Sequence, residues 1–208
     1  SPARSRPPLP QGQAYYVLLE CMGCEPERFE SLLAHAMDSG LVVDASVAQD
    51  ERQCAALWGL RDDVEQMGRF GRPFAYDVSL PLADTEVYAA RLRAALSQRW
   101  PDHRCWFYGH LGDGNLHVVA QVPVPDEAAH AAVDALVYEP LATLGGSISA
   151  EHGIGLEKKS WLHVSRKPAE LALMRSLKAT LDPRGILNPG KLLPDAAMPS
   201  MPAPRRTE

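Results

Sequence analysis

The chain has 208 residues, of which 46% are hydrophobic and 23% charged, a balance typical of a folded globular protein rather than a disordered one. Its formal net charge is −5 and no long basic stretch is present, so nucleic acid is not expected as a partner. No apolar run approaches the roughly 20 residues that span a bilayer, and no segment has the pattern of a signal peptide. We therefore expect a cytoplasmic protein without a membrane span, peripheral to a membrane at most.

Both ends of the chain are rich in proline. We expect residues 1–13 to form a disordered or extended segment and residues 195–208 a flexible tail, because such stretches bury too little apolar surface to fold. Residues 14–194 contain no repeat and no long linker, so we expect them to form the folded domain.

Apolar spacing along residues 14–194 predicts alternating strands and helices. Strands are expected at 14–20, 41–44, 74–80, 104–108 and 115–122. Helices are expected at 26–39, 50–67, 84–100, 126–144 and 168–181, with Pro140 kinking or splitting the fourth. Paired strands with helices between them indicate an α+β fold: an antiparallel sheet with helices on one face, ferredoxin-like, plus a C-terminal helical segment.

The densest chemical signal is the segment Tyr108–His117, YGHLGDGNLH. Asp113 and Gly114 are typical of a two-residue hairpin turn, which would place His110 directly opposite His117. Directly opposed Cβ atoms lie about 4.5–5.5 Å apart, so the two imidazoles could bind one metal ion. A hairpin whose histidines only pack or hydrogen-bond is the alternative, and a longer glycine loop would change the register without separating them much.

A second signal is the segment Ser149–Gly155, SAEHGIG. Glu151 is a candidate third metal ligand, and His152 beside it is a candidate base for a metal-bound hydroxyl. Two histidines and a carboxylate suit zinc, manganese or iron, with positions left open for a substrate. Taken alone, this segment is explained about as well by a solvated loop. It supports a metal site only in combination with the segment Tyr108–His117.

Arg61 is the third signal, because it shares the apolar face of its predicted helix with Trp58. We expect it to hold a substrate carboxylate through two hydrogen bonds or, alternatively, to pair with an internal carboxylate such as Asp77. The segment 181–191, rich in proline and glycine, predicts a turn. Lys191 beside that turn could neutralise an anion, although spacing alone does not show this.

Together and in this order, these segments resemble the C-terminal domain of FAD-linked oxidases of the vanillyl-alcohol-oxidase type, especially the D-lactate and D-2-hydroxyglutarate dehydrogenases. The resemblance covers about residues 14–194. Its matching pieces are Trp58-x-x-Arg61, Tyr76–Pro81, the segment from His110 to His117, Glu151-His152-Gly153, and Asp182-Pro183 with Asn188-Pro-Gly-Lys191.

The resemblance implies that His110, His117 and Glu151 hold a divalent ion, zinc in the first instance and manganese or iron as alternatives. This ion would bind the hydroxyl and carboxylate of a D-2-hydroxy acid and lower the pKa of the hydroxyl. His152 would act as general base, and hydride would pass from the substrate carbon to FAD.

The resemblance also implies roles at the edge of the site. Arg61 would clamp a substrate carboxylate. Asn115, Asn188 and Lys191 would lie near the flavin or shape the pocket.

Three positions of this chain differ from the D-2-hydroxyglutarate dehydrogenases that it resembles. The resemblance implies that those enzymes recognise their substrate with a lysine, a threonine and an asparagine. This chain has Ala75 in place of the lysine, Glu65 in place of the threonine and Val119 in place of the asparagine. Ala75 and Val119 are apolar, Glu65 would repel a second carboxylate, and Val119 is expected on the same face of its strand as His117. We therefore expect a D-2-hydroxy acid with a less polar side chain, such as D-lactate or a larger monocarboxylate.

In this family a FAD-binding domain normally precedes the region, and the chain contains no GxGxxG or P-loop fingerprint. We expect the chain to be a fragment, an excised domain or one subunit of a split enzyme. It should be inactive alone and act together with a FAD-binding domain or subunit. A homodimer is compatible with the sequence. Two other classes stay open. One is a stand-alone metallohydrolase that uses the same ligands to activate water, and the other is a non-catalytic subunit of a split flavoenzyme.

Overall fold

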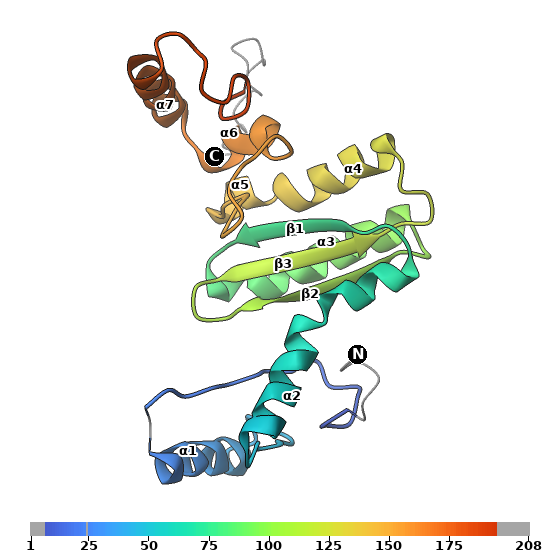
Figure 1. Cartoon of the computed structure of the whole chain (residues 1–208). Helices are drawn as coiled ribbons and strands as arrows, with labels where there is room; N and C mark the ends of the chain where they lie inside the picture. Colours follow the sequence, from blue (N-terminus) through green and yellow to red (C-terminus); the bar gives the residue numbers. More distant parts are fainter. Residues whose placement is uncertain (1–6, 24, 195–208) are drawn as a thin grey trace, which may run out of the picture. The chain divides into compact units, whose positions relative to one another are not determined.

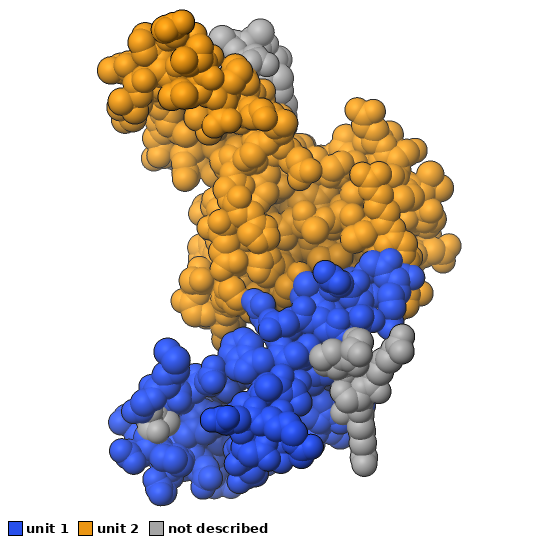
Figure 2. All heavy atoms as spheres, in the orientation of Figure 1, with its two compact units in different colours: residues 1–69 blue, residues 70–208 orange. Residues whose placement is uncertain are grey.

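The computed structural model describes residues 7–23 and 25–194. The chain divides into two compact units, 1–69 and 70–208, which Figure 2 distinguishes by colour. The predicted tail and the first six residues of the predicted N-terminal segment lie outside the described residues. Within the described part of the chain, no helix is both long and apolar enough to cross a membrane.

Unit 1 is helical and contains α1 (Pro26–Asp38), α2 (Glu51–Asp62) and most of the 3₁₀ helix η2 (Val64–Phe70) (Figure 1). Pro26 opens α1, and Gly40 follows the end of α1 with a φ of 74°, as its sequence predicts. The predicted helix over 50–67 is instead α2 followed by η2, because the backbone leaves the helical conformation at Asp63.

Both strands predicted in unit 1, at 14–20 and 41–44, are wrong. Neither segment pairs with another strand, and Tyr15, Val17 and Leu19 are exposed. An extended apolar run becomes a strand only when a neighbouring backbone satisfies its hydrogen bonds. No described segment of unit 1 provides that neighbour.

Unit 2 is built on a three-stranded antiparallel sheet in the order β1-β3-β2. The strands are β1 (Phe74–Ser79), β2 (Arg104–His110) and β3 (Asn115–Gln121), with η3 (Leu82–Asp84) and α3 (Thr85–Arg99) between β1 and β2 and α4 (Glu127–Tyr138) after β3 (Figure 1). This confirms the predicted α+β class. Next to β1, where a fourth strand of a ferredoxin-like sheet would lie, an isolated bridge joins Ser79 to Ser147 in the described part of the chain.

One face of the sheet forms the core with α3 and α4. Tyr76 and Val78 are buried there, together with Leu96 of α3 and Val133 of α4. Each such side chain contributes about 1.5–3 kcal/mol when it leaves water. The residues that alternate with them in β1, including Asp77, lie on the opposite face of the sheet, where the predicted site is found.

The C-terminal part of unit 2 is made of short helices. Pro140 separates α4 from α5 (Leu141–Leu144), which confirms the predicted split. A loop over 145–158 leads to η4 (Lys159–Trp161), α6 (Leu162–Ser165) and α7 (Pro168–Leu181). Leu171 of α7 is buried, whereas Leu177 and Leu181 of the same helix are exposed.

Candidate metal and substrate site

The β2–β3 hairpin places both predicted histidine ligands on the face of the sheet opposite the core. Its loop has four residues, 111–114, so that His110 pairs with Asn115 and His117 pairs with Tyr108. The predicted direct pair between the two histidines is therefore wrong. They nevertheless remain neighbours on one face, with ring centroids 6.0 Å apart.

The reason for the longer loop lies in its backbone. A two-residue type I′ turn needs positive φ at both central residues, and of Asp113 and Gly114 only Gly114 has it, at 71°. Instead, the Asp113 carboxylate accepts a hydrogen bond from the Asn115 N–H at 2.9 Å, and this local side-chain contact stabilises the end of the loop.

Glu151 reaches both histidines from the loop that follows α5. Its Oε1 lies 3.0 Å from His110 Nδ1, and its Oε2 lies 3.9 Å from His117 Nε2. Ligand atoms about 2.1 Å from a tetrahedral ion lie roughly 3.4 Å from one another, and these two distances lie on either side of that value. Glu151 thus has one carboxylate oxygen near each predicted histidine ligand. The described atoms that lie close enough together to hold one ion are those of His110, Asp113 and Glu151, whereas His117 falls in a second group.

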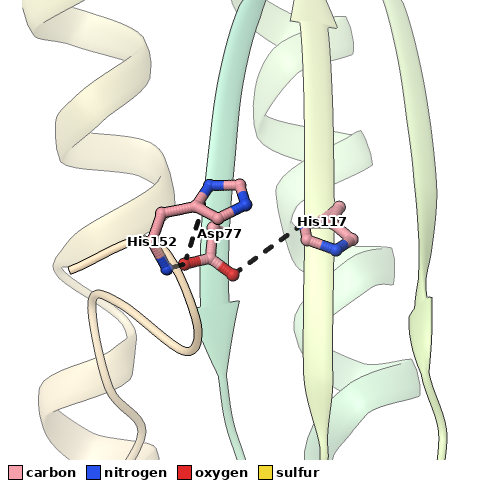
Figure 3. A group of neighbouring side chains, drawn as sticks. All are labelled: Asp77, His117 and His152. Carbon is pink, nitrogen blue, oxygen red and sulfur yellow. Dashed lines mark hydrogen bonds and ion pairs between the residues drawn. The ribbon is translucent and has the colours of Figure 1, made fainter. Parts of the chain in front are cut away.

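A second group of potential ligands, Asp77, His117 and His152, adjoins the first (Figure 3). Asp77 comes from β1, His117 from β3 and His152 from the loop. The rings of His117 and His152 have centroids 5.7 Å apart. His117 belongs to this second group and lies 3.9 Å from Glu151 of the first, so it lies between the other predicted metal ligands and the predicted base.

Asp77 anchors the loop to the sheet. Its side chain is almost fully buried, and its Oδ2 accepts the backbone N–H groups of Ala150, Glu151 and His152 at 3.0–3.1 Å. Burial alone would raise the pKa of Asp77, but these N–H groups and the Lys158 ammonium, 3.4 Å away, lower it to about 2. Asp77 is therefore a carboxylate at neutral pH, and it fixes the backbone of Glu151 and His152.

The electrostatic surroundings of His117 favour its neutral form. Burial lowers the pKa of His117, and the nearby carboxylates of Asp77 and Glu151 only partly oppose this. A neutral imidazole is the form that binds a metal ion.

A pocket of about 400 Å³ lies beside His117 and His152. Its other lining residues are Ala75, Tyr76, Asp77, Tyr108, Val119, Gly153, Ile154, Gly155, Leu156, Glu157 and Lys158. The structure therefore places both predicted substrate residues of the sheet, Ala75 and Val119, in one pocket with the predicted base. Sequence reasoning missed Tyr108 and Lys158; the pairing of Tyr108 with His117 depends on the hairpin register.

Lys158 is buried, and its ammonium donates hydrogen bonds to acceptors within the protein. Its Nζ donates to the Asp77 carbonyl at 3.1 Å, to Asp77 Oδ2 at 3.4 Å and to Ser149 Oγ at 3.0 Å. A lysine ammonium has three N–H groups, so these acceptors satisfy all of them.

Asn115 is 4% exposed, and neither atom of its side-chain amide has a hydrogen-bond partner among the described residues. A buried amide without partners is costly. Its position on the same strand face as His117 makes it a candidate to meet a polar atom of a bound group.

The remaining predicted residues lie outside this cluster. Arg61 is in unit 1, at the C-terminal turn of α2, where its guanidinium pairs with Asp62 at 3.1 Å; the cation on Asp77 is Lys158. The predicted turn that follows α7 does form, and it holds Asn188 and Lys191. The substrate and flavin roles of these residues stay predictions.

Comparison with known proteins agrees with the fold and the motifs. The chain matches the family described as FAD linked oxidases, C-terminal domain, over residues 3–192, and it therefore belongs to that family. This confirms the predicted family.

Particular relatives carry a more specific name. The chain is 43% identical over 192 residues to the mitochondrial D-2-hydroxyglutarate dehydrogenase of Bos taurus, which covers 90% of the chain and 35% of the relative. It is 39% identical over 196 residues to the D-2-hydroxyglutarate dehydrogenase of Xanthomonas citri pv. viticola (89% and 41%) and 36% identical over 186 residues to that of Stutzerimonas stutzeri (86% and 40%). The chain thus spans less than half the length of each of these relatives. The cellular compartment of the chain stays a prediction.

Proposed function

We propose that this chain is the substrate- and metal-binding part of a flavin-dependent dehydrogenase that oxidises a D-2-hydroxy acid to a 2-oxo acid. The observation that carries the proposal is the position of the Glu151 carboxylate, with one oxygen near His110 and the other near His117, next to a pocket bordered by His152. Family membership supports FAD as the cofactor, and the names of the relatives support a 2-hydroxy acid as the substrate class.

The residues present fit both groups that this reaction needs. His110, His117 and Glu151 would hold the divalent ion, for which zinc is proposed and manganese or iron are the alternatives. Asn115 offers the flavin a buried amide with both atoms unpartnered, and Asn188 and Lys191 are proposed to lie on the flavin side. When bound, the ion supplies a Lewis acid for the substrate hydroxyl and FAD supplies the acceptor of the hydride.

His152 is the proposed general base that takes the hydroxyl proton. Its side chain is 66% exposed and lines the pocket, so a substrate can reach it. Its Nδ1 lies 4.0 Å from Asp77 Oδ2. This carboxylate would stabilise the imidazolium that forms when His152 accepts the proton.

The pocket lining supports a substrate with a less polar side chain, such as D-lactate or a larger monocarboxylate. Ala75, Val119 and Leu156 are apolar. The cation of the lining, Lys158, has all its N–H groups engaged, and Glu157 would repel an anion. A second carboxylate on the substrate would therefore find no free cation among these lining residues.

The test compares substrates in a flavin-loaded protein that contains this chain. We expect kcat/KM to be higher for D-lactate and longer apolar D-2-hydroxy acids than for D-2-hydroxyglutarate. Ala75→Lys should raise kcat/KM for D-2-hydroxyglutarate at least tenfold relative to D-lactate, because it adds a cation to the pocket, whereas the uncharged control Ala75→Met should not.

The relatives' names favour D-2-hydroxyglutarate as the second candidate. A wild-type preference for D-2-hydroxyglutarate would contradict the proposed substrate and support this candidate. Metal-dependent ester cleavage by the chain without flavin would instead support the metallohydrolase alternative.

A further inference from the structure

The two carboxylate oxygens of Asp77 have different neighbours in the proposed site (Figure 3): Oδ2 contacts the loop that carries His152, and Oδ1 lies near His117. Its Oδ2 accepts the N–H groups of Ala150, Glu151 and His152. Its Oδ1 lies 3.8 Å from His117 Nδ1 and is buried without a hydrogen-bond partner among the described residues. An unpaired buried carboxylate oxygen is costly, and the structure places a potential donor, His117 Nδ1, next to it.

The two ring nitrogens of His117 face opposite partners. Nδ1 is turned toward Asp77 Oδ1, whereas Nε2 is turned toward Glu151 Oε2 at 3.9 Å. In a neutral imidazole one nitrogen carries the proton and the other keeps its lone pair. A carboxylate beside Nδ1 favours the proton there, which leaves the Nε2 lone pair pointing at the proposed ion.

We propose that Asp77 is a positioning residue that holds His117 as its Nδ1–H tautomer and, through its second oxygen, holds Glu151 and His152 in place. The inference rests on the proposed function, because it takes His117 and Glu151 as ligands of one ion. A histidine that binds a metal commonly donates its other N–H to a carboxylate, and such partners matter for affinity. The 3.8 Å separation needs only a small approach to become a hydrogen bond, and contacts of this kind often tighten when the site is filled.

Asp77 is better suited to this role than to binding the ion itself. Its Oδ2 is already surrounded by three backbone N–H groups and the ammonium of Lys158. Lys158 also donates to the carbonyl oxygen of Asp77 and to Ser149, which fixes the rotation of the carboxylate between the loop and His117.

The test is Asp77→Asn in the full chain. The asparagine carbonyl should face the three loop N–H groups, so its NH₂ group should face His117 Nδ1 and donate to it. The tautomer of His117 should therefore change to Nε2–H, and the proton would occupy the position proposed for the metal bond. Tyr88→Phe is the matched control, because it also removes a buried hydrogen bond of unit 2, from the Tyr88 hydroxyl to the Val137 carbonyl, but within the core.

Two measurements read the outcome. Proton–nitrogen correlation spectra of the metal-free chain report the tautomer, and competition with a chromophoric chelator reports the Kd for zinc. We expect Nδ1–H in the wild type, Nε2–H in Asp77→Asn, and a 10- to 100-fold weaker zinc affinity in this variant. Tyr88→Phe should keep the wild-type tautomer and a Kd within twofold of the wild type.

Nε2–H in the wild type, or a zinc Kd within twofold of wild type in Asp77→Asn, would overturn the inference. The wild-type tautomer needs no variant, so it decides the matter even if Asp77→Asn does not fold. If the wild type shows Nδ1–H but binds no zinc, the proposed metal site fails and the tautomer assignment stands. If His110→Ala and Glu151→Ala lose zinc while Asp77→Asn keeps it, the positioning role alone fails.

Discussion

Replacing Asp77 with asparagine should destabilise unit 2 by an amount that depends on pH. The carboxylate is buried and accepts three backbone N–H groups, and its pKa falls from 3.8 to about 2. Because the pKa is lowered in the folded state, the charged carboxylate contributes stability that is fully present above the unfolded value. This stability is lost as the pH falls through the folded value of about 2.

The magnitude follows from the two pKa values. They differ by about 1.8, which at about 1.36 kcal/mol per pH unit gives about 2.4 kcal/mol at pH 7. At pH 3 the same two values leave about 1.3 kcal/mol. The variant has no charge at any pH, so this part of the difference from wild type should shrink by about 1 kcal/mol between pH 7 and pH 3. The loss of the counter-ion of Lys158 adds a cost that does not depend on pH in this range.

The assay is urea unfolding at pH 7, 5 and 3, followed by tryptophan fluorescence. Three of the four tryptophans, Trp100, Trp106 and Trp161, lie in unit 2 and report on it. A difference in the free energy of unfolding that is the same at pH 7 and pH 3 would refute the reasoning. A variant as stable as the wild type at pH 7 would refute it as well.

Three further substitutions test the fold. Leu96→Ala, in the fully buried core, should lower the free energy of unfolding by about 2–5 kcal/mol in urea, and a loss below about 1 kcal/mol would show that the core is not packed as described. Asp126→Ala removes the side chain that accepts the Ala129 N–H at the start of α4 and should cost about 1 kcal/mol by the same assay, with Asp126→Asn milder. Gly114→Ala places a Cβ 2.5 Å from the Leu80 carbonyl oxygen, at a residue with a positive φ. Both Tm and zinc affinity should therefore fall. Unchanged zinc affinity would show that the conformation of this loop does not affect the proposed metal site.

Much of the fold of unit 2 could be predicted because its strands have one face in the core. Phe74, Tyr76 and Val78, the apolar residues of the alternating pattern, are the buried core face of β1, although Asp77 on the other face is buried as well. Pro140 ends α4 because proline cannot continue the helical hydrogen bonds. The run at 14–20 could not be judged in this way. It is apolar throughout, and whether it becomes a strand depends on a partner backbone that local sequence does not specify.

The site was predictable in its residue types and less so in its geometry. The histidines and Glu151 stand out by composition, but the register of the hairpin depends on whether Asp113 adopts a positive φ, which the dipeptide Asp113-Gly114 only favours. The contacts of Asp77 were missed because they come from residues up to 81 positions further along the chain. The only sequence feature that could have indicated them is an aspartate within a predicted strand, on the face away from the core.

Elemental mass spectrometry of the purified chain tests directly whether His110, His117 and Glu151 hold one metal ion. We expect close to one zinc, or one manganese or iron, per chain in the wild type, and its loss in both His110→Ala and Glu151→Ala. His163→Ala is the matched control, because this histidine hydrogen-bonds to Ser160 and stacks on Trp161, and its metal content should equal that of the wild type. Metal that persists at wild-type stoichiometry in either ligand variant, with both variants folded, would show that these residues do not hold the ion.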